Sequence, residues 1–306
     1  MTDIYLGQQK SNKGCLVIAV LVAVAFAAFV FWRFTRPATS TPPPSAESPA
    51  AAEAPASTAA PSTPSSDPGA ALLNSARQFK NEDKYLEARD KAYEVLDQSS
   101  NAAARTAAEQ LLGEVNVALV LSPRQMPEKI DYAVQPGDAL VLLARKNGTT
   151  IDTIQIGNRL TSANIRVGDR LRIFTGKFAI KVSKSRNDMV LLMNDRFFKR
   201  YFVGTGQYGK TPTGELVIKD KIPNPPWWRS DGKQIPFGDT NNVLGTRWMS
   251  LKYADDSPLS GYGIHGTWEP ETIGKQASAG CIRLLNSDVE ELFTLVPEGT
   301  PVTITE

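Results

Sequence analysis

The hydrophobic pattern of this chain changes several times, and it begins with an unbroken apolar run. Residues 15–32 read CLVIAVLVAVAFAAFVFW and carry no charged side chain. A helix of this length rises about 27 Å, which is close to the thickness of the hydrocarbon core of a bilayer. The run therefore predicts a transmembrane helix. A cleaved signal peptide with Lys10 and Lys13 as its charged region is the alternative, but Arg33 and Arg36 stand where a small-residue cleavage site belongs.

The segments on either side of this run are polar or low in complexity. Residues 1–14 are predicted to be a short cytoplasmic N-terminus. Residues 33–69 are rich in Pro, Ala, Ser and Thr, so they have too few apolar side chains to offset the entropy lost on ordering. They predict a disordered linker, and as an extended polyproline chain it would reach on the order of 100 Å.

Helical periodicity follows the linker. Two sets of apolar residues recur at the spacing of one helix face. They are Tyr85, Ala88, Ala92, Val95 and Leu96, and then Ala108, Leu111, Leu112, Val115 and Leu119. Asp67-Pro68 is expected to form the cap and the first turn of the first helix. Residues 70–122 therefore predict a helical module, either an α-helical hairpin or a three-helix packing unit, with binding of a protein partner as the alternative role.

The segment 130–174 combines apolar residues at the spacing of strands with others at the spacing of helices. A short strand at 132–134 is followed by a Gln-Pro-Gly turn, and Asp138 is expected to cap a helix that carries Leu140 on its apolar side. Asn147-Gly148 should end that helix, and Thr150 should start a second one. A closing strand is expected at 170–173. The segment therefore predicts a small βααβ unit.

From residue 177 onward the spacing becomes that of strands. Apolar residues alternate or cluster in short segments that Gly, Thr and Pro residues separate. These segments are 178–182, 190–193, 198–203, 216–218 and 248–251. One late helix is expected over 288–295, with Asn286-Ser287 as its capping residues. Residues 177–306 therefore predict a predominantly β domain.

Composition and charge narrow the possible functions. A net charge of +2, without basic stretches interleaved with aromatic residues, argues against binding of nucleic acid. The chain has only the cysteines Cys15 and Cys281, one in the apolar run and one near the C-terminus, so Cys281 is predicted to be a free thiol. It has one histidine, His265. One His and one Cys are too few ligands for a zinc site, and no metal is expected.

Cys281 and His265 together predict nucleophilic chemistry. The histidine precedes the cysteine by 16 residues, and the cysteine lies in a tight Ser-Ala-Gly-Cys turn. A thiolate is the reactive form, and an adjacent imidazole supplies it either as a general base or in a standing thiolate–imidazolium pair. Gly280 frees the backbone to direct N–H groups toward a developing oxyanion. Acyl transfer through a thioester is the expected reaction class, and a buried structural cysteine is the alternative.

The βααβ segment resembles the LysM domain. The match extends over the whole segment. It is carried by Tyr132, Val134, Pro136, Gly137, Asp138, Leu140, Ala144, Ile154, Asn158, Leu160, Ile165, Gly168, Leu171 and Ile173. The resemblance implies binding of glycan that contains N-acetylglucosamine, in a groove between the loop Gly137, Asp138, Ala139, Leu140 and the loop near 161–166. A small scaffold that has lost this binding is the alternative.

The C-terminal domain resembles the L,D-transpeptidase catalytic domain of the YkuD type. The resemblance is carried by YGIHGTWEPETIG at 262–274 and SAGCIRLLNSDVEEL at 278–292, and by three earlier stretches. Those stretches are YFVGTGQYGKTPTGEL at 201–216, NPPWW at 224–228 and LGTRWMSL at 244–251. It implies a YkuD-like β-sandwich. The expected fold is thus multidomain: transmembrane helix, disordered linker, α-helical hairpin module, βααβ LysM domain and predominantly β catalytic domain.

The resemblance also implies roles for single residues. Cys281 matches the nucleophile, His265 the upstream histidine and Gly280 the glycine before the nucleophile. Ser278 is expected to orient the turn or to contribute a hydroxyl. Arg283 and Tyr262 are expected to bind substrate, with an ion pair that stabilises the fold as the alternative for Arg283.

One position departs from the commonest pattern of the family. Many members have a second histidine before the glycine, whereas this chain has Ala279. The role of base therefore falls on His265 unless the protein is inactive. The group that fixes the imidazole tautomer is not evident in the sequence, and a backbone carbonyl near Gly266 is expected to do so.

The implied function is formation of 3→3 cross-links in peptidoglycan through a cysteine acyl-enzyme, without metal or organic cofactor. An L,D-carboxypeptidase that uses water as acceptor, and a non-catalytic peptidoglycan-binding tether, are the alternatives. The expected partners are peptidoglycan stem peptides and glycan strands, and the inner membrane through one helix. The catalytic domain is then expected on the periplasmic side.

Overall fold

The computed structural model describes residues 67–229 and 231–306. The predicted N-terminal segment, the predicted transmembrane helix at 15–32 and almost all of the predicted linker lie outside these residues. Within the described ranges, no helix combines the length and the apolar character that crossing a membrane requires. The elements below belong to the unit that residues 64–306 form.

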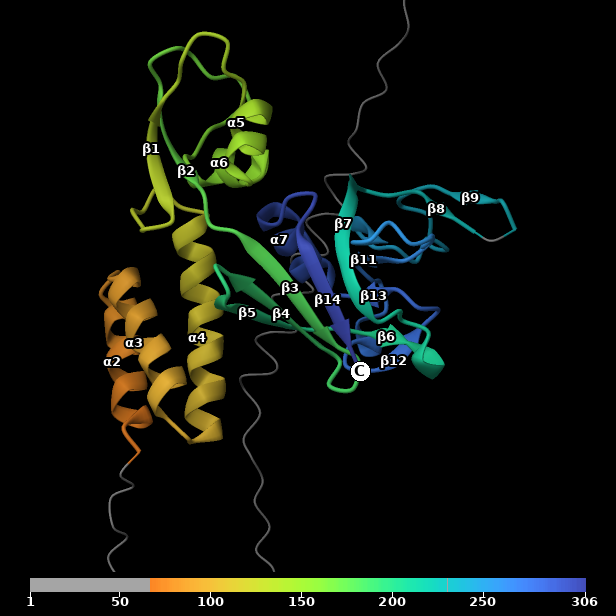
Figure 1. The fold of residues 1–306 in the computed structure, drawn as a ribbon, viewed down its shortest axis with the longest axis horizontal. Helices are drawn as coiled ribbons and strands as arrows, with labels where there is room; N and C mark the ends of the chain where they lie inside the picture. Colours follow the sequence, from red (N-terminus) through yellow and green to blue (C-terminus); the bar gives the residue numbers. More distant parts are fainter. Residues whose placement is uncertain (1–66, 230) are drawn as a thin grey trace, which may run out of the picture. The chain divides into compact units, whose positions relative to one another are not determined.

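The helical module contains three helices in its described part, so the predicted hairpin was wrong and the three-helix alternative is confirmed (Figure 1). They are α2 (Gly69–Asn81), α3 (Tyr85–Gln98) and α4 (Ala102–Val120). The Asp67 carboxylate accepts a hydrogen bond from the Gly69 N–H at 2.7 Å, while Pro68 occupies the position before the first helical residue. Asn101 caps α4, because its Oδ1 accepts from the Ala104 N–H at 3.0 Å. Both predicted apolar faces point into the packing between the helices.

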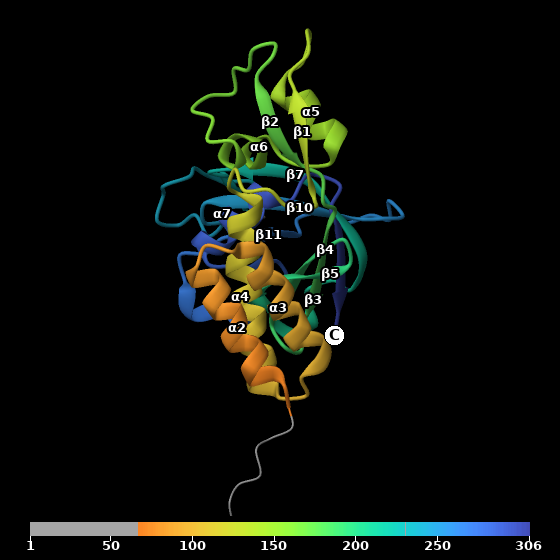
Figure 2. The ribbon, with the colours of Figure 1, turned by 90° about the vertical axis from the view of Figure 1, so that its left-hand side faces the viewer.

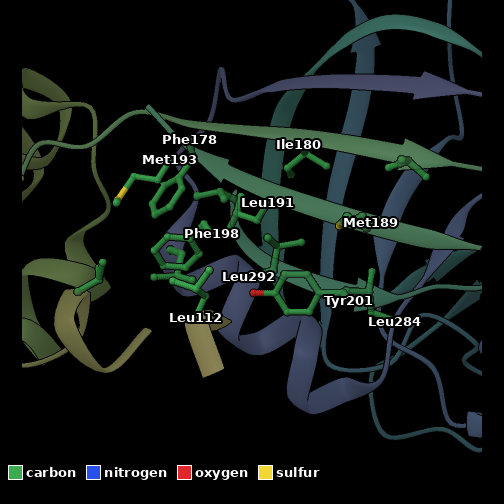
Figure 3. Close-up of a cluster of buried hydrophobic side chains, with 14 of the residues drawn as sticks. Leu112, Phe178, Ile180, Met189, Leu191, Met193, Phe198, Tyr201, Leu284 and Leu292 are labelled. Carbon is green, nitrogen blue, oxygen red and sulfur yellow. The ribbon is translucent and has the colours of Figure 1, made fainter. Parts of the chain in front are cut away.

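The helical module packs on an edge of the large sheet of the C-terminal domain. The hydroxyl of Tyr93 donates to the Phe197 carbonyl at 2.7 Å, and Nδ2 of the buried Asn116 donates to the Phe198 carbonyl at 3.0 Å. Both carbonyls belong to β5 (Arg196–Phe202), the terminal strand of the sheet. These bonds satisfy edge groups that would otherwise pair with another strand. Figure 3 shows Leu112 of α4 beside Phe178 and Phe198, so one apolar core joins the two parts.

The βααβ unit forms as the spacing predicted. It consists of β1 (Lys129–Ala133), α5 (Leu140–Asn147), α6 (Ile151–Gly157) and β2 (Arg170–Phe174), with β1 and β2 antiparallel (Figure 2). Gly148 ends α5 in the left-handed conformation at φ 67°, where a glycine is favoured. Thr150 caps α6, because its hydroxyl accepts from the Thr153 N–H at 2.9 Å.

The prediction that Asp138 caps α5 was wrong. The residue before α5 is Ala139, and no side chain caps the helix. The Asp138 carboxylate instead accepts from the Gln135 N–H and from the Tyr132 hydroxyl, each at 2.8 Å. These two bonds lower the pKa of Asp138. The carboxylate therefore closes the loop before the helix, because its nearest donors belong to β1 and the turn.

The βααβ unit contacts the C-terminal end of the last helix. The hydroxyls of Thr150 and Thr153 both donate to the carbonyl of Thr294, which belongs to α7 (Asn286–Leu295). A residue outside the βααβ unit binds the same helix end. The ammonium of Lys221 donates to the Phe293 carbonyl at 2.5 Å and to the Val296 carbonyl at 2.6 Å. The last carbonyls of a helix have no partner within it, so these donors stabilise the end of α7.

The C-terminal domain is built on one curled, mixed sheet. Within the described residues this sheet has eight strands, in the order β13-β11-β10-β7-β14-β3-β4-β5. Their bounds are β3 (Phe178–Ser183), β4 (Asp188–Met193), β5, β7 (Gly214–Pro223), β10 (Arg247–Tyr253), β11 (Gly263–His265), β13 (Ile282–Arg283) and β14 (Pro301–Thr305). The five predicted strand segments fall on β3, β4, β5, β7 and β10. The resemblance implied a YkuD-like β-sandwich, whereas these eight strands form one continuous hydrogen-bonded sheet.

Short elements complete the domain. They are β6 (Thr205–Gly206), η1 (Gln207–Gly209), β8 (Trp227–Trp228), β9 (Gln234–Ile235), η2 (Pro270–Thr272) and β12 (Gln276–Ser278). β6 pairs with β12 and β8 pairs with β9. Leu292 of α7 packs with Leu191 of β4 and the buried ring of Tyr201 in the main core (Figure 3).

The prediction that Asn286-Ser287 cap the late helix was wrong. Asn286 is the first residue of α7, Leu285 precedes it, and no side chain caps the helix. Oδ1 of Asn286 instead accepts from the Thr246 N–H at 3.1 Å. A Cβ at Gly266 would lie 2.1 Å from this oxygen. The amide therefore ties α7 to the start of β10 and leaves room there only for a glycine.

Candidate active site

His265 and the residue after Cys281 lie on neighbouring strands. β11 and β13 are parallel, with Ile264 opposite Ile282 and His265 opposite Arg283. Side chains alternate along a strand, so His265 and Arg283 point to one face of the sheet while the isoleucines point to the other, and Cys281 immediately precedes β13. The strand pairing thus places Cys281 directly before the strand that neighbours the one ending at His265, the two residues that the sequence predicted as a pair.

The imidazole of His265 has a defined tautomer. Its Nδ1 lies 2.6 Å from the Gly266 carbonyl oxygen, and a carbonyl only accepts, so Nδ1 carries the proton. This bears out the expected backbone carbonyl near Gly266. The ring is buried and stacks on Trp248 with 5.7 Å between centroids. Burial lowers the pKa of His265 to about 4, and the Gly266 contact only partly opposes this effect. At neutral pH the ring is uncharged and Nε2 is its basic atom.

The thiol of Cys281 is partly exposed and close to backbone groups. Its Sγ donates to the Gly261 carbonyl at 3.4 Å. Burial of the rest of the side chain raises the pKa of the thiol, while the backbone at Gly263 and the positive charge of Arg283 lower it. A raised pKa for Cys281 and a lowered one for His265 favour the neutral thiol with the neutral imidazole. Of the two activation modes that the sequence left open, the general base is favoured.

The turn before the nucleophile is held from two sides. The buried Ser278 hydroxyl donates to the Cys281 carbonyl at 2.6 Å and accepts from the Gly280 N–H at 3.0 Å. Gly280 has φ +139°, and a Cβ there would lie 2.6 Å from the Tyr262 ring. The orienting role expected for Ser278 is therefore the one that its contacts support. Glycine is required at 280 by both backbone conformation and space.

Two residues that were expected to bind substrate have partners within the protein. Nη1 of Arg283 donates to the Glu269 carboxylate at 2.9 Å, in an ion pair whose carboxylate side is half exposed. The ring of Tyr262 lies against Gly280. The ion pair is the alternative predicted for Arg283. Its Nε is buried and lacks a partner among the described residues, so the guanidinium is not fully satisfied by the fold.

An aromatic pocket of about 260 Å³ opens beside Cys281. Its wall is mostly apolar. Besides Gly261 and Cys281, the pocket is lined by Ile222, Pro225, Pro226, Trp227, Trp228, Leu244 and Trp248. Trp228 is 65% exposed, a high value for so large an apolar side chain. In the sequence, NPPWW at 224–228 marks only the family resemblance, and no spacing places these residues beside Cys281. The sequence feature that could have indicated a binding surface here is the pair of adjacent tryptophans after two prolines, which does not fit an alternating strand pattern.

The predicted glycan-binding residues form the loop before α5. Gly137 is exposed in a left-handed turn with φ +88°, and Asp138 and Ala139 are partly exposed. The side chain of Leu140 is buried in the core of the unit. Leu140 could therefore contact a glycan only through its backbone. In residues 67–229 and 231–306 no three His, Cys, Asp or Glu side chains gather as metal ligands.

The sequence profile of the L,D-transpeptidase catalytic domain, YkuD, matches residues 177–304, and that of the LysM domain matches residues 132–174. A relative from Bacillus licheniformis, named putative L,D-transpeptidase YkuD, is 35% identical over 182 residues, which are 57% of this chain and 98% of the relative. The Bacillus subtilis protein of the same name is 34% identical over 182 residues, with the same coverage.

Among solved structures, the NMR structure of the catalytic domain of an E. faecium L,D-transpeptidase is 24% identical. It covers 42% of this chain and 97% of its own, with a TM-score of 0.34. The sequence relationship with the Bacillus proteins spans almost their whole length. The chain therefore belongs to the L,D-transpeptidase family, an acyltransferase family, and carries a LysM domain ahead of its YkuD-type catalytic domain.

Proposed function

We propose that this protein is a peptidoglycan L,D-transpeptidase that forms 3→3 cross-links, with Cys281 as nucleophile and His265 as base. The proposal is carried by two observations: Cys281 immediately precedes β13, which pairs in parallel with the strand that ends at His265, and the Gly266 carbonyl holds Nδ1–H of His265. That bond leaves Nε2 as the proton acceptor. Acyl transfer is the chemistry that a thiol, a base and an oriented backbone turn support together.

The first half of the reaction forms the acyl-enzyme. Nε2 of His265 takes the thiol proton as Sγ of Cys281 attacks the carbonyl carbon between residues three and four of a stem peptide. The S–C bond forms and the carbonyl electrons move to oxygen. When the tetrahedral intermediate collapses, the C–N bond breaks, and the departing D-alanine amine takes the proton from the imidazolium. A thioester on Cys281 remains.

The second half transfers the acyl group. The side-chain amine of a neighbouring stem attacks the thioester carbon, and His265 takes the proton that the new amide loses. The C–S bond breaks and the thiolate recovers that proton. Burial keeps the imidazole uncharged at neutral pH, so Nε2 is free to accept a proton in each half, and the imidazolium that forms returns it readily in the next step.

The acceptor distinguishes this function from an L,D-carboxypeptidase, which uses water in the second half. Purified full-length protein, solubilised in detergent, is incubated with tetrapeptide muropeptides, and the products are identified by mass spectrometry. The proposal expects dimers that are linked between two third residues. Products that consist of tripeptides alone would replace it with the carboxypeptidase. Unchanged substrate would leave the non-catalytic tether.

We also propose that the LysM unit holds glycan strands at the loop Gly137–Ala139, and that residues 15–32 anchor the protein in the inner membrane with the catalytic domain in the periplasm. The exposed left-handed turn at Gly137 and the apolar run of the sequence support these assignments. The full chain should stay with membranes after carbonate washing and should be cleaved by protease added to spheroplasts. Release by the wash, or protection from the protease, would contradict the anchor or its orientation.

A further inference from the structure

The backbone turn at the nucleophile has a third support, which comes from a distant loop. The hydroxyl of Thr211 accepts from the Gly206 N–H at 2.7 Å and donates to the Gly280 carbonyl at 2.9 Å. The side chain is only 1% exposed, so water does not replace either bond. One hydroxyl therefore joins the loop after β6 to the peptide that links Gly280 with Cys281.

This contact determines where the N–H of Cys281 points. The carbonyl of Gly280 and the N–H of Cys281 belong to the same trans peptide, in which the two groups point in opposite directions. Because Thr211 holds the carbonyl on its side, the N–H is directed away from Thr211. The hydrogen bonds of the described residues leave this N–H without an acceptor. A backbone N–H that is fixed and unpaired beside a nucleophile is a donor for the oxyanion.

The surroundings allow little other movement of this peptide. A Cβ at Gly206 would lie 2.8 Å from Cα of Gly280, so the two backbones are in contact. The Ser278 hydroxyl holds the next carbonyl, that of Cys281. The Ser278 hydroxyl binds the Gly280 N–H and the Cys281 carbonyl, which belong to the two neighbouring peptides. The Thr211 hydrogen bond is therefore the chief contact that opposes rotation of the Gly280–Cys281 peptide.

We infer that Thr211 is a positioning residue for acyl transfer, because its hydroxyl aims the Cys281 N–H at the oxyanion that forms on the carbonyl under attack. The inference rests on the function proposed above. Thr211 does not touch the reacting atoms, and its effect passes through the Gly280–Cys281 peptide. It should therefore matter for attack on a carbonyl and not for reactions of the thiol that create no oxyanion.

Two reactions of Cys281 separate these cases. Acylation by a carbapenem forms an S–C bond to the lactam carbonyl and passes through an oxyanion before the lactam C–N bond breaks and its nitrogen takes a proton. Alkylation by iodoacetamide forms an S–C bond as iodide leaves, with no oxyanion. Both rates are measured on the full chain by digestion and mass spectrometry of the peptide that contains Cys281, so Cys15 does not contribute.

Thr211→Val keeps the shape and removes both hydrogen bonds, whereas Thr211→Ser keeps the hydroxyl. The ratio of acylation to alkylation should fall about tenfold or more in Thr211→Val, toward the roughly 100- to 1,000-fold that loss of an oxyanion donor costs. It should stay within about threefold of wild type in Thr211→Ser. Thr211→Ala gives the same test if the valine variant does not fold.

Thr300→Val is the matched control. Thr300 is also buried, and its hydroxyl donates to the Pro297 carbonyl at 2.6 Å, in the loop before β14. Its ratio should equal that of wild type. The inference is overturned if the ratio is unchanged in Thr211→Val or Thr211→Ala. It is also overturned if the ratio falls equally in Thr211→Ser or Thr300→Val. In each of these cases, acylation of the wild-type protein still upholds the proposed function. Failure of wild-type protein to be acylated overturns the proposed function itself.

Discussion

Replacing Cys281 by alanine should abolish the covalent adduct that a carbapenem forms with this protein, and cross-linking should fall by about four orders of magnitude or more. The reason is chemical, because the acyl-enzyme needs a sulfur at this position and Cys15 lies in the apolar run at the other end of the chain. Intact-mass spectrometry measures the adduct, and muropeptide analysis measures the cross-links.

Cys281→Ser supplies the comparison that alanine alone does not. A serine hydroxyl has nearly the shape of the thiol but is a poorer nucleophile, so binding should be kept while the adduct forms far more slowly. Thermal unfolding of both variants should be close to that of wild type, because the side chain is partly exposed. An adduct of equal yield on Cys281→Ala would place the reactive group elsewhere and would end the thiol mechanism.

Replacing His265 by alanine should lower the rate of carbapenem acylation about 100- to 10,000-fold at pH 7, the range expected for loss of a general base. Iodoacetamide alkylation of Cys281 should also slow at neutral pH. Both effects follow from the tautomer, since the Gly266 carbonyl holds the Nδ1 proton and leaves Nε2 to take the proton of the thiol. Rates of the two reactions against pH are the measurement.

The pH profile carries the sharper test. Burial lowers the pKa of His265 to about 4, so wild-type acylation should rise with pH through about 4 and then level off toward neutral. In His265→Ala only the thiolate fraction reacts, so the rate should keep rising through neutral pH toward the raised pKa of Cys281. A wild-type rate that also climbs steadily through neutral pH would show that the thiol is activated without His265.

Folding must be followed at each pH in this experiment. The pKa of His265 is ordinarily 6.5 and falls to about 4 in the folded chain, so between these values the unfolded chain binds the proton more readily. The contribution of His265 to stability is complete above pH 6.5 and is lost progressively as the pH falls toward 4. Circular dichroism at each pH separates this loss from the loss of the base.

Local elements of the fold were predictable because their determinants are close in sequence. The end of α5 at Gly148 and the start of α6 at Thr150 depend on residues within one turn. The caps assigned to Asp138 and Asn286 failed because donors outside the helix competed for the same oxygens. Asp138 accepts from Tyr132 and Gln135, and Asn286 accepts from Thr246. Spacing within a helix does not show such a competitor.

The site was predictable in its reactive groups but not in its surroundings. A chain with one histidine leaves no other imidazole for the thiol, so His265 and Cys281 could be paired from the sequence. Trp228 and Thr211 could not be placed in the same way. Trp228 and Cys281 line the same pocket although they are distant in sequence. The Thr211 hydroxyl donates to the Gly280 carbonyl, which is 69 residues away along the chain.

The sequence by itself determined the reactive groups, the βααβ unit and the strand segments, because residue chemistry and short periods decide them. The tertiary structure decided how the reactive groups are used. Pairing of β11 with β13 places Cys281 directly before the strand next to His265, and the Gly266 carbonyl selects the imidazole tautomer. The Thr211 hydroxyl orients the peptide before Cys281. Each of these is a backbone contact set by strand register or by a distant loop, and a linear pattern does not specify such contacts.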